Sequence, residues 1–288
     1  MILINSSRIS NEIGNPIMIA THPRSGTHLT LDLLRKQFKE CQSWLWFGET
    51  LHNSYLNLDH LSPDSSPHIN QKKAIALLRR CKRPLLKTHC LPNFQEIGKE
   101  NINFVLTLKE KADIYYVVRD GRDVICSVHS WQQRFNPRAR CSFSEFLRQR
   151  KDGLSYPKKW AHHVSNWLKY PQIQVLRFEK IVSNTSEVLN LICNKSQIKP
   201  MYIYPLLPER KKTGNRWEDY YLRLTRQLNS TTIVGRYKNQ KPSRWQEVFT
   251  FEDRKFFHEE AGEVLIKLGY EVSENWIDFP ERKIKKLR

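Results

Sequence analysis

The strongest structural signal in the sequence is an apolar run that leads into a short loop and then into an amphipathic stretch. Residues 16–20 read Pro-Ile-Met-Ile-Ala, residues 21–28 read Thr-His-Pro-Arg-Ser-Gly-Thr-His, and leucines follow at positions 29, 31, 33 and 34. This order predicts a buried strand over 16–21 and a helix from Gly26 to about Phe38. A loop between a strand and a helix N-terminus is a common binding site for phosphate-like anions. We therefore expect an oxyanion site here, with an ordinary strand–helix turn as the alternative.

The loop departs from the familiar nucleotide-binding pattern G-x-x-x-x-G-K-[ST]. Thr21 stands where the first glycine is required, and Thr27 follows Gly26 where the lysine is required. Arg24 supplies a permanent cation with a planar set of donors, while Ser25 and Thr27 supply hydroxyl groups. The loop thus keeps the charge and donors for an anion without the usual lysine.

Further strands and helices alternate along the chain. We predict strands over 84–88, 114–118 and 173–176, and helices over 72–82, from Gly121 to about Arg134, around Trp160 to Leu168, from Glu179 to about Cys193 and over 251–268. Residues 48–70 show no clear period and are predicted as loop, and Ser142 with Glu145 forms a capping box before another helix. Such alternation predicts an α/β fold with a mainly parallel β-sheet flanked by helices on both faces. We find no linker, so we expect a single domain over 1–288, with its core at about 16–270 and a basic, solvated C-terminal tail at about 281–288.

Composition limits the classes of partner. The chain has 48 Lys and Arg against 29 Asp and Glu, a net charge of +19, which suggests a polyanionic partner. The six cysteines form no C-x-x-C pair, so we expect no metal site and a reducing compartment. The N-terminus is too short and polar for a secretion signal, and no stretch is apolar enough to cross a membrane. We therefore expect a cytoplasmic protein without a membrane span.

Two more segments carry candidate chemistry at predicted strand ends. In Lys87-Thr88-His89, the imidazole can transfer protons near neutral pH, although it is one of ten histidines and could be purely structural. Arg119 follows the next strand, and Ser127 lies about two turns into the helix after it. Both could bind one phosphate, or Arg119 could instead pair with Asp123. Because open α/β sheets bind ligands beyond the carboxyl ends of their strands, all these residues are placed where a ligand is expected.

Together these segments resemble the sulfotransferase family, which uses 3′-phosphoadenosine 5′-phosphosulfate (PAPS). Residues 21–29 resemble the family's T-Y-P-K-S-G-T-T-W, residues 87–89 match its K-T-H, and residues 119–127 match R-x-x-x-D-V-x-x-S at full spacing. Trp160, Trp167 and Phe178-Glu179 match a further pattern, W-x-x-x-h-x-x-W followed by a strand and F/Y-E. The segments also stand in the family's order, which makes the set far more specific than any one motif.

The resemblance implies a P-loop-like fold and a role for each matching residue. His89 would be the general base, and Arg24 and Lys87 would stabilise charge in the transition state. The residues implied to bind the cofactor are Arg24, Ser25, Gly26, Thr27 and His28 at the 5′-phosphosulfate, Arg119 and Ser127 at the 3′-phosphate, Phe178 near the adenine, and Arg236 and Lys238 in the weakly matching segment 235–245. No metal or nucleic acid is expected. The acceptor would be a hydroxyl or amine on a small molecule or glycan.

Several positions depart from the family pattern. Arg24 replaces the usual lysine, His28 a threonine, Leu29 a tryptophan and Phe178 a common tyrosine. Arginine stays charged across the useful pH range, so Arg24 would act as a cation and not as an acid. Gly121 and Arg122, inside the third motif, are unremarkable in the sequence. The family's dimerisation signature is not preserved, and the sequence leaves the oligomeric state open.

Other functions and two classes of acceptor stay open at this level. A P-loop-type small-molecule kinase would need a lysine and a magnesium-binding aspartate that the sequence does not show. A non-enzymatic RNA or polyanion binder would fit the charge, but no RNA-binding module is recognisable. For the acceptor, Trp44, Trp46, Phe47, Trp131 and Phe135 suggest an apolar cleft. Arginines at 134, 138, 140, 148 and 150 suggest an acidic glycan or a phosphorylated compound.

Overall fold

The computed structural model describes residues 13–47, 49–206 and 244–278. Within these residues the chain forms two compact units. We call the first the sheet unit; it contains the described residues of 13–21, 26–117 and 172–206. The second, the helical unit, contains 22–25, 118–171 and 244–278. That the whole chain is one domain stays a prediction.

The sheet unit is built on a five-stranded sheet in the order β2-β3-β1-β4-β7. The strands are β1 (Ile17–Thr21), β2 (Leu56–Asn57), β3 (Leu85–Thr88), β4 (Asp113–Val118) and β7 (Gln174–Arg177). The β1 strand runs parallel to both β3 and β4, and β2 runs parallel to β3. In this register Ala20 lies beside Thr88, so β1 and β3 end at the same edge of the sheet. The predicted parallel α/β sheet is therefore confirmed.

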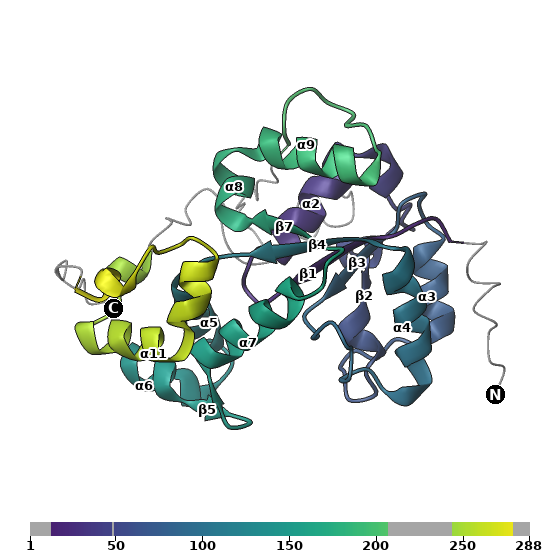
Figure 1. The fold of residues 1–288 in the computed structure, drawn as a ribbon. Helices are drawn as coiled ribbons and strands as arrows, with labels where there is room; N and C mark the ends of the chain where they lie inside the picture. Colours follow the sequence, from purple (N-terminus) through teal and green to yellow (C-terminus); the bar gives the residue numbers. More distant parts are fainter. Residues whose placement is uncertain (1–12, 48, 207–243, 279–288) are drawn as a thin grey trace. The chain divides into compact units, whose positions relative to one another are not determined.

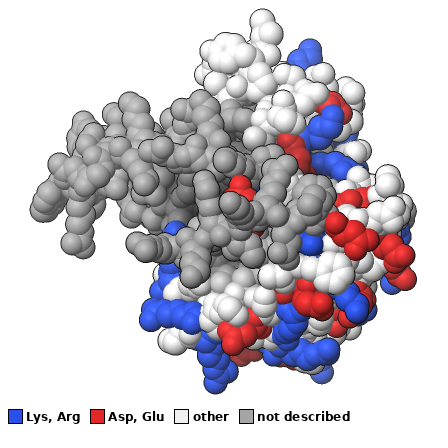
Figure 2. Space-filling view, turned by 90° about the vertical axis from the view of Figure 1, so that its left-hand side faces the viewer, with Lys and Arg blue, Asp and Glu red and all other residues white. Residues whose placement is uncertain are grey.

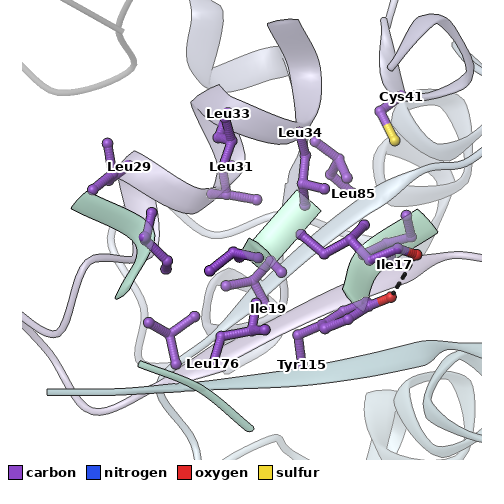
Figure 3. Packing of buried hydrophobic residues seen from close by; sticks show 14 of the residues in the cluster. Ile17, Ile19, Leu29, Leu31, Leu33, Leu34, Cys41, Leu85, Tyr115 and Leu176 are labelled. Carbon is purple, nitrogen blue, oxygen red and sulfur yellow. Dashed lines mark hydrogen bonds between the residues drawn. The ribbon is translucent and has the colours of Figure 1, made fainter. Parts of the chain in front are cut away.

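Helices cover both faces of the sheet in this unit (Figure 1). On one side lie α2 (Thr27–Gln37), α8 (Phe178–Ser183) and α9 (Thr185–Ser196), and on the other lie α3 (Gln71–Leu78) and α4 (Lys99–Lys111). Figure 3 shows the first interface, where leucines of α2 pack on the side chains of alternate strand residues such as Ile17 and Ile19. Strand side chains alternate between faces, so the buried Met18 lies on the opposite side. This double burial explains why β1 is apolar throughout.

Three parts of the sheet unit differ from the prediction. Helix α3 ends at Leu78, four residues earlier than expected, and α4 was not predicted at all. The expected helix over 179–193 is two helices, because Asn184 ends α8 and its side chain caps the start of α9 by accepting the N–H of Glu187. The predicted loop over 48–70 contains the short strand β2 and two single turns of 3₁₀ helix.

The helical unit packs its helices around aromatic side chains. It contains α5 (Gly121–Gln132), α6 (Phe143–Arg148), the hairpin of β5 (Arg150–Lys151) and β6 (Leu154–Ser155), α7 (Tyr156–Leu168) and α11 (Phe251–Lys267). The predicted Ser142–Glu145 capping box begins α6. Trp160 of α7 is fully buried, and its ring centroid lies 6.0 Å from that of Phe257 in α11. A Cβ atom on Gly121 would lie 2.5 Å from the Trp160 ring, so only glycine permits this approach of α5 to α7.

Arg122 has a structural role that was not expected. Its side chain is only 2% exposed and forms ion pairs with Asp120 and Glu271. The guanidinium carbon also lies 3.9 Å from the ring centroid of Trp245 and 4.7 Å from that of Trp276. Burial alone would lower the pKa of Arg122, but the two carboxylates raise it above its ordinary value. Arg122 therefore holds the start of α5 against the C-terminal segment of the unit.

Candidate functional site

The loop from Thr21 to Thr27 has the backbone of an anion-binding turn. Arg24 and Gly26 have positive φ angles of 70° and 107°, and Gly26 is the N-cap residue of α2. A Cβ atom at Gly26 would lie 2.5 Å from the ring of Phe178, the first residue of α8. Backbone conformation and lack of space both require glycine here.

Two features of the loop suit a bound anion. Gly26 has no side chain that could cap the N-terminus of α2, where backbone N–H groups and the helix dipole attract negative charge. The Oγ atom of Ser25 is buried, and it has no hydrogen-bond partner among the residues that the structure describes. A buried hydroxyl without a partner costs free energy unless a ligand satisfies it. The residues present therefore fit a group with phosphate or sulfate oxygens.

His89 is held beside the end of β1. Its Nδ1 atom lies 2.8 Å from the carbonyl oxygen of Thr21 and 3.1 Å from the Thr21 hydroxyl. The hydroxyl of Thr21 lies 2.6 Å from that of Thr27. A carbonyl oxygen can only accept, so Nδ1 carries the proton and donates it. In the neutral ring the lone pair is then on Nε2, as a general base requires.

Lys87 lies two residues earlier, and Asp59 neutralises it. The Lys87 Nζ atom is 3.5 Å from Asp59 Oδ2 and 3.3 Å from Asn57 Oδ1. Burial lowers the pKa of Lys87, and the nearby Asp59 carboxylate opposes that shift only in part. Burial would raise the pKa of Asp59, but His89 and Lys87 outweigh it and lower that pKa. The sheet unit thus contains a group of two basic side chains and one carboxylate, in which Lys87 is buried and Asp59 and His89 are half-buried.

In the helical unit, Arg24 lies beside the residues of the third motif. Its Nε donates to Ser127 Oγ at 3.3 Å, and its backbone oxygen accepts a hydrogen bond of 3.3 Å from Arg119 Nη1. The Arg24 guanidinium also lies 6.0 Å from the ring centroid of Trp131. The Asp123 carboxylate accepts the backbone N–H of Trp245 at 3.1 Å, so it anchors the C-terminal segment. The structure thus gathers Arg24, Arg119 and Ser127 in this unit.

The remaining predicted cofactor residues lie in several places. His28 makes edge-to-face ring contacts with His52 and Tyr55 of the sheet unit. Phe178 is buried in the core of that unit beside Gly26, and Leu29 is fully buried there as well. Arg236 and Lys238 lie outside the described residues.

Sequence reasoning missed two residues of this site. Asp59 lies in a segment without periodicity, and β2 before it is only two residues long, too short to give a strand pattern. Thr21 was noted as the replacement of a glycine and as the first residue of the matching motif but was given no role, yet its hydroxyl and carbonyl both contact other site residues. The one available signal was that Thr21 ends an apolar strand, and no local pattern marks Asp59.

The described residues were compared with two further features, a metal centre and a membrane-spanning helix, and contain neither. No group of three or more His, Cys, Asp and Glu there could hold a metal ion. No helix in the described ranges is long and apolar enough to cross a membrane. The expected cytoplasmic location stays a prediction.

Several solved structures are similar to this chain. A mouse sulfotransferase, SULT7A1, solved with PAP, is 16% identical, with a TM-score of 0.52 over 92% of this chain and 87% of that chain. A sulfotransferase domain from the curacin biosynthetic pathway is 15% identical (TM-score 0.47, 90% of this chain and 99% of that chain). A sulfotransferase from Alicyclobacillus acidocaldarius is 16% identical (TM-score 0.44, 75% and 96%). A search of curated proteins found no match.

The family assignment rests on the sequence match. A family model described as the sulfotransferase domain matches residues 15–269. This range is most of the chain, and it contains the anion loop, Lys87-Thr88-His89 and the Arg119–Ser127 motif. The chain therefore belongs to the sulfotransferase family, whose enzymes transfer a sulfuryl group from the donor PAPS.

Proposed function

We propose that this protein transfers a sulfuryl group to a hydroxyl or amine with His89 as the general base. One observation carries the proposal: Nδ1 of His89 lies 2.8 Å from the carbonyl oxygen of Thr21. This contact leaves Nε2 to take the proton of the attacking group, which is worth about 10²- to 10⁴-fold in rate. When bound, PAPS supplies the sulfuryl group and departs as adenosine 3′,5′-bisphosphate (PAP).

We propose that Arg24, Ser25, Gly26, Thr27 and His28 bind the 5′-phosphosulfate. The support is the uncapped N-terminus of α2, the buried Ser25 hydroxyl without a partner among the described residues, and the fixed charge of Arg24. Fixed donors directed at developing negative charge are the main source of catalysis in the related transfer of phosphoryl groups.

Lys87 and Arg24 are proposed to stabilise charge in the transition state. Burial and the lowered pKa of Lys87 mean that its ammonium is poorly solvated, so it interacts strongly with any negative charge nearby. Arg119 and Ser127 are proposed to bind the 3′-phosphate. Their contacts with Arg24, through its backbone oxygen and its Nε, support a common role in nucleotide binding.

The proposed acceptor has an apolar or aromatic body, because exposed aromatic side chains are present in both units. Trp46 and Phe47 in the sheet unit are 65% and 82% exposed, and Phe135 in the helical unit is 68% exposed. In the helical unit, the ring of Trp131 lies next to Arg24 and 5.3 Å from that of Phe135. Contiguous patches of exposed apolar side chains often mark binding surfaces.

The arginines that suggest an acidic acceptor are partly neutralised by acidic side chains. Arg148 pairs with Asp253, and Arg150 pairs with Glu260. In the described part of the face shown in Figure 2, basic and acidic side chains are interspersed and form no continuous basic surface.

A screen with labelled PAPS tests the function and the acceptor class together. The library should contain phenols, aliphatic alcohols, amines and acidic glycans, with each product identified by mass. We expect sulfated phenols or apolar alcohols. Transfer confined to acidic glycans would overturn the acceptor class, and Mg²⁺-dependent phosphoryl transfer from ATP would overturn the reaction.

A further inference from the structure

A single carboxylate contacts four consecutive residues at and after the end of β3, Lys87 to Cys90. Asp59 Oδ1 accepts the backbone N–H of His89 at 2.9 Å and the hydroxyl of Thr88 at 2.9 Å. Its Oδ2 lies 3.2 Å from the same N–H and 3.5 Å from the Nζ of Lys87.

The local fold explains how Asp59 reaches this position. The β2 strand ends at Asn57, which lies beside Lys87 in the parallel ladder. The Asn57 side chain accepts the N–H of Asp59 and begins the 3₁₀ turn that follows. This turn carries Asp59 past the end of β2 and across the end of β3. A short strand and a cap therefore aim one carboxylate at the neighbouring strand end.

We propose that Asp59 is a positioning residue for sulfuryl transfer, which fixes the backbone of His89 and balances the charge of Lys87. The inference rests on the proposed function of His89. Two bonds to the His89 N–H fix the start of that side chain, and the Thr21 carbonyl fixes its ring. His89 is thus held at its backbone by Asp59 and at its ring by Thr21.

The carboxylate also acts on the imidazole through its charge. His89 lowers the pKa of Asp59, and by reciprocity the Asp59 carboxylate favours the protonated form of His89. A stronger base at Nε2 takes the acceptor proton more readily. The titratable groups that face Asp59 are Lys87, His89, Cys90, Tyr55 and His60.

A neutral variant with a matched control separates this role from general electrostatics. Asp59→Asn keeps the shape and removes the charge. Asp64→Asn makes the same chemical change at an exposed position in the same segment of the sheet unit. Asp59→Glu keeps the charge with a longer side chain, and it decides the test if Asp59→Asn fails to fold.

The measurement is a pH titration of the histidine side chains by long-range ¹H–¹⁵N NMR on the full chain with PAP bound. The His89 signal is assigned by its loss in His89→Gln. We expect the His89 titration midpoint to fall in Asp59→Asn and to stay near the native value in Asp59→Glu and Asp64→Asn. We also expect transfer to fall roughly 10- to 100-fold in Asp59→Asn, as for a misplaced catalytic group.

Two results would overturn the role of Asp59: a native midpoint in folded Asp59→Asn, or a midpoint in Asp59→Glu that falls well below the native value. Failure of the proposed function would look different. In that case the native protein would show no heat of PAP binding, whatever the midpoint of His89.

Discussion

The hydroxyl oxygens of Thr21 and Thr27 lie 2.6 Å apart, and they join the last residue of β1 to the first residue of α2. The loop between them carries the charge and the hydroxyl groups proposed for the 5′-phosphosulfate. Because the Thr21 hydroxyl also lies 3.1 Å from His89, one side chain links the anion loop to the proposed base.

Thr21→Val should destabilise the fold by about 1–2 kcal/mol, because the buried Thr27 hydroxyl loses its partner. Urea unfolding followed by tryptophan fluorescence measures this. Thr30→Val is the control. The Thr30 hydroxyl donates to the Gly26 carbonyl, and this carbonyl keeps the backbone N–H of Thr30 as a second donor when the hydroxyl is removed. The loss of stability in Thr30→Val should therefore be smaller than in Thr21→Val. Equal stability of Thr21→Val and the native protein would contradict the role of this pair.

Gly26→Ala should destabilise the protein by at least about 2 kcal/mol, from backbone strain at φ 107° and from the clash with Phe178. The double variant Gly26→Ala, Phe178→Leu should recover part of this loss, because it removes the clash but not the strain. The same unfolding experiment measures both variants. A loss below about 0.5 kcal/mol in the single variant, the range of neutral surface changes, would show that the loop does not need glycine.

Arg24→Lys should weaken PAP binding about tenfold, a change of about 1.4 kcal/mol. Lysine lacks the Nε–H that bonds to Ser127 and the planar donor set of arginine. Isothermal calorimetry measures the affinity. Arg79→Lys makes the same exchange at an exposed position at the end of α3 and should bind PAP as the native protein does. Unchanged affinity for PAP in Arg24→Lys would contradict a direct role of the Arg24 side chain in nucleotide binding.

The pH dependence of stability should carry the signature of Asp59. Because His89 and Lys87 outweigh burial, the folded-state pKa of Asp59 lies below its ordinary 3.8. Its ionisation therefore stabilises the fold above pH 3.8, and this stabilisation is lost as the pH falls through the lower folded-state value. We expect the free energy of unfolding of the native protein to exceed that of Asp59→Asn by about 2 kcal/mol at pH 7. This difference should shrink below about pH 4. A gap that is constant from pH 7 to pH 3 in urea titrations would refute this.

The sequence was sufficient for the parts of the fold that have a strong local pattern. The β1 strand, α2, α5 and α11 were predicted because each has a continuous apolar run or a regular apolar face. Helix α4 was missed because its buried residues, Phe104, Val105 and Leu108, are too few and irregular to stand out among polar neighbours. The split between α8 and α9 depends on one side-chain cap at Asn184, which periodicity cannot reveal.

The residues of the candidate site can likewise be separated into those with a local sequence pattern and those without one. Arg24, Lys87, His89, Arg119 and Ser127 were predicted because they stand in motifs of fixed spacing. Asp59 and Arg122 depend on contacts between residues far apart in sequence, His89 in one case and Glu271 in the other. Such contacts follow from the tertiary fold, and no local pattern encodes them.

The most direct test of the account compares the native protein with His89→Gln in two measurements. Calorimetry with PAP measures nucleotide binding, and transfer of labelled sulfate from PAPS to the best acceptor of the screen measures the reaction. We predict that both proteins bind PAP with the same affinity, and that transfer falls about 10²- to 10⁴-fold in the variant. No PAP binding by the native protein, or transfer by His89→Gln at the native rate, would contradict the central claim.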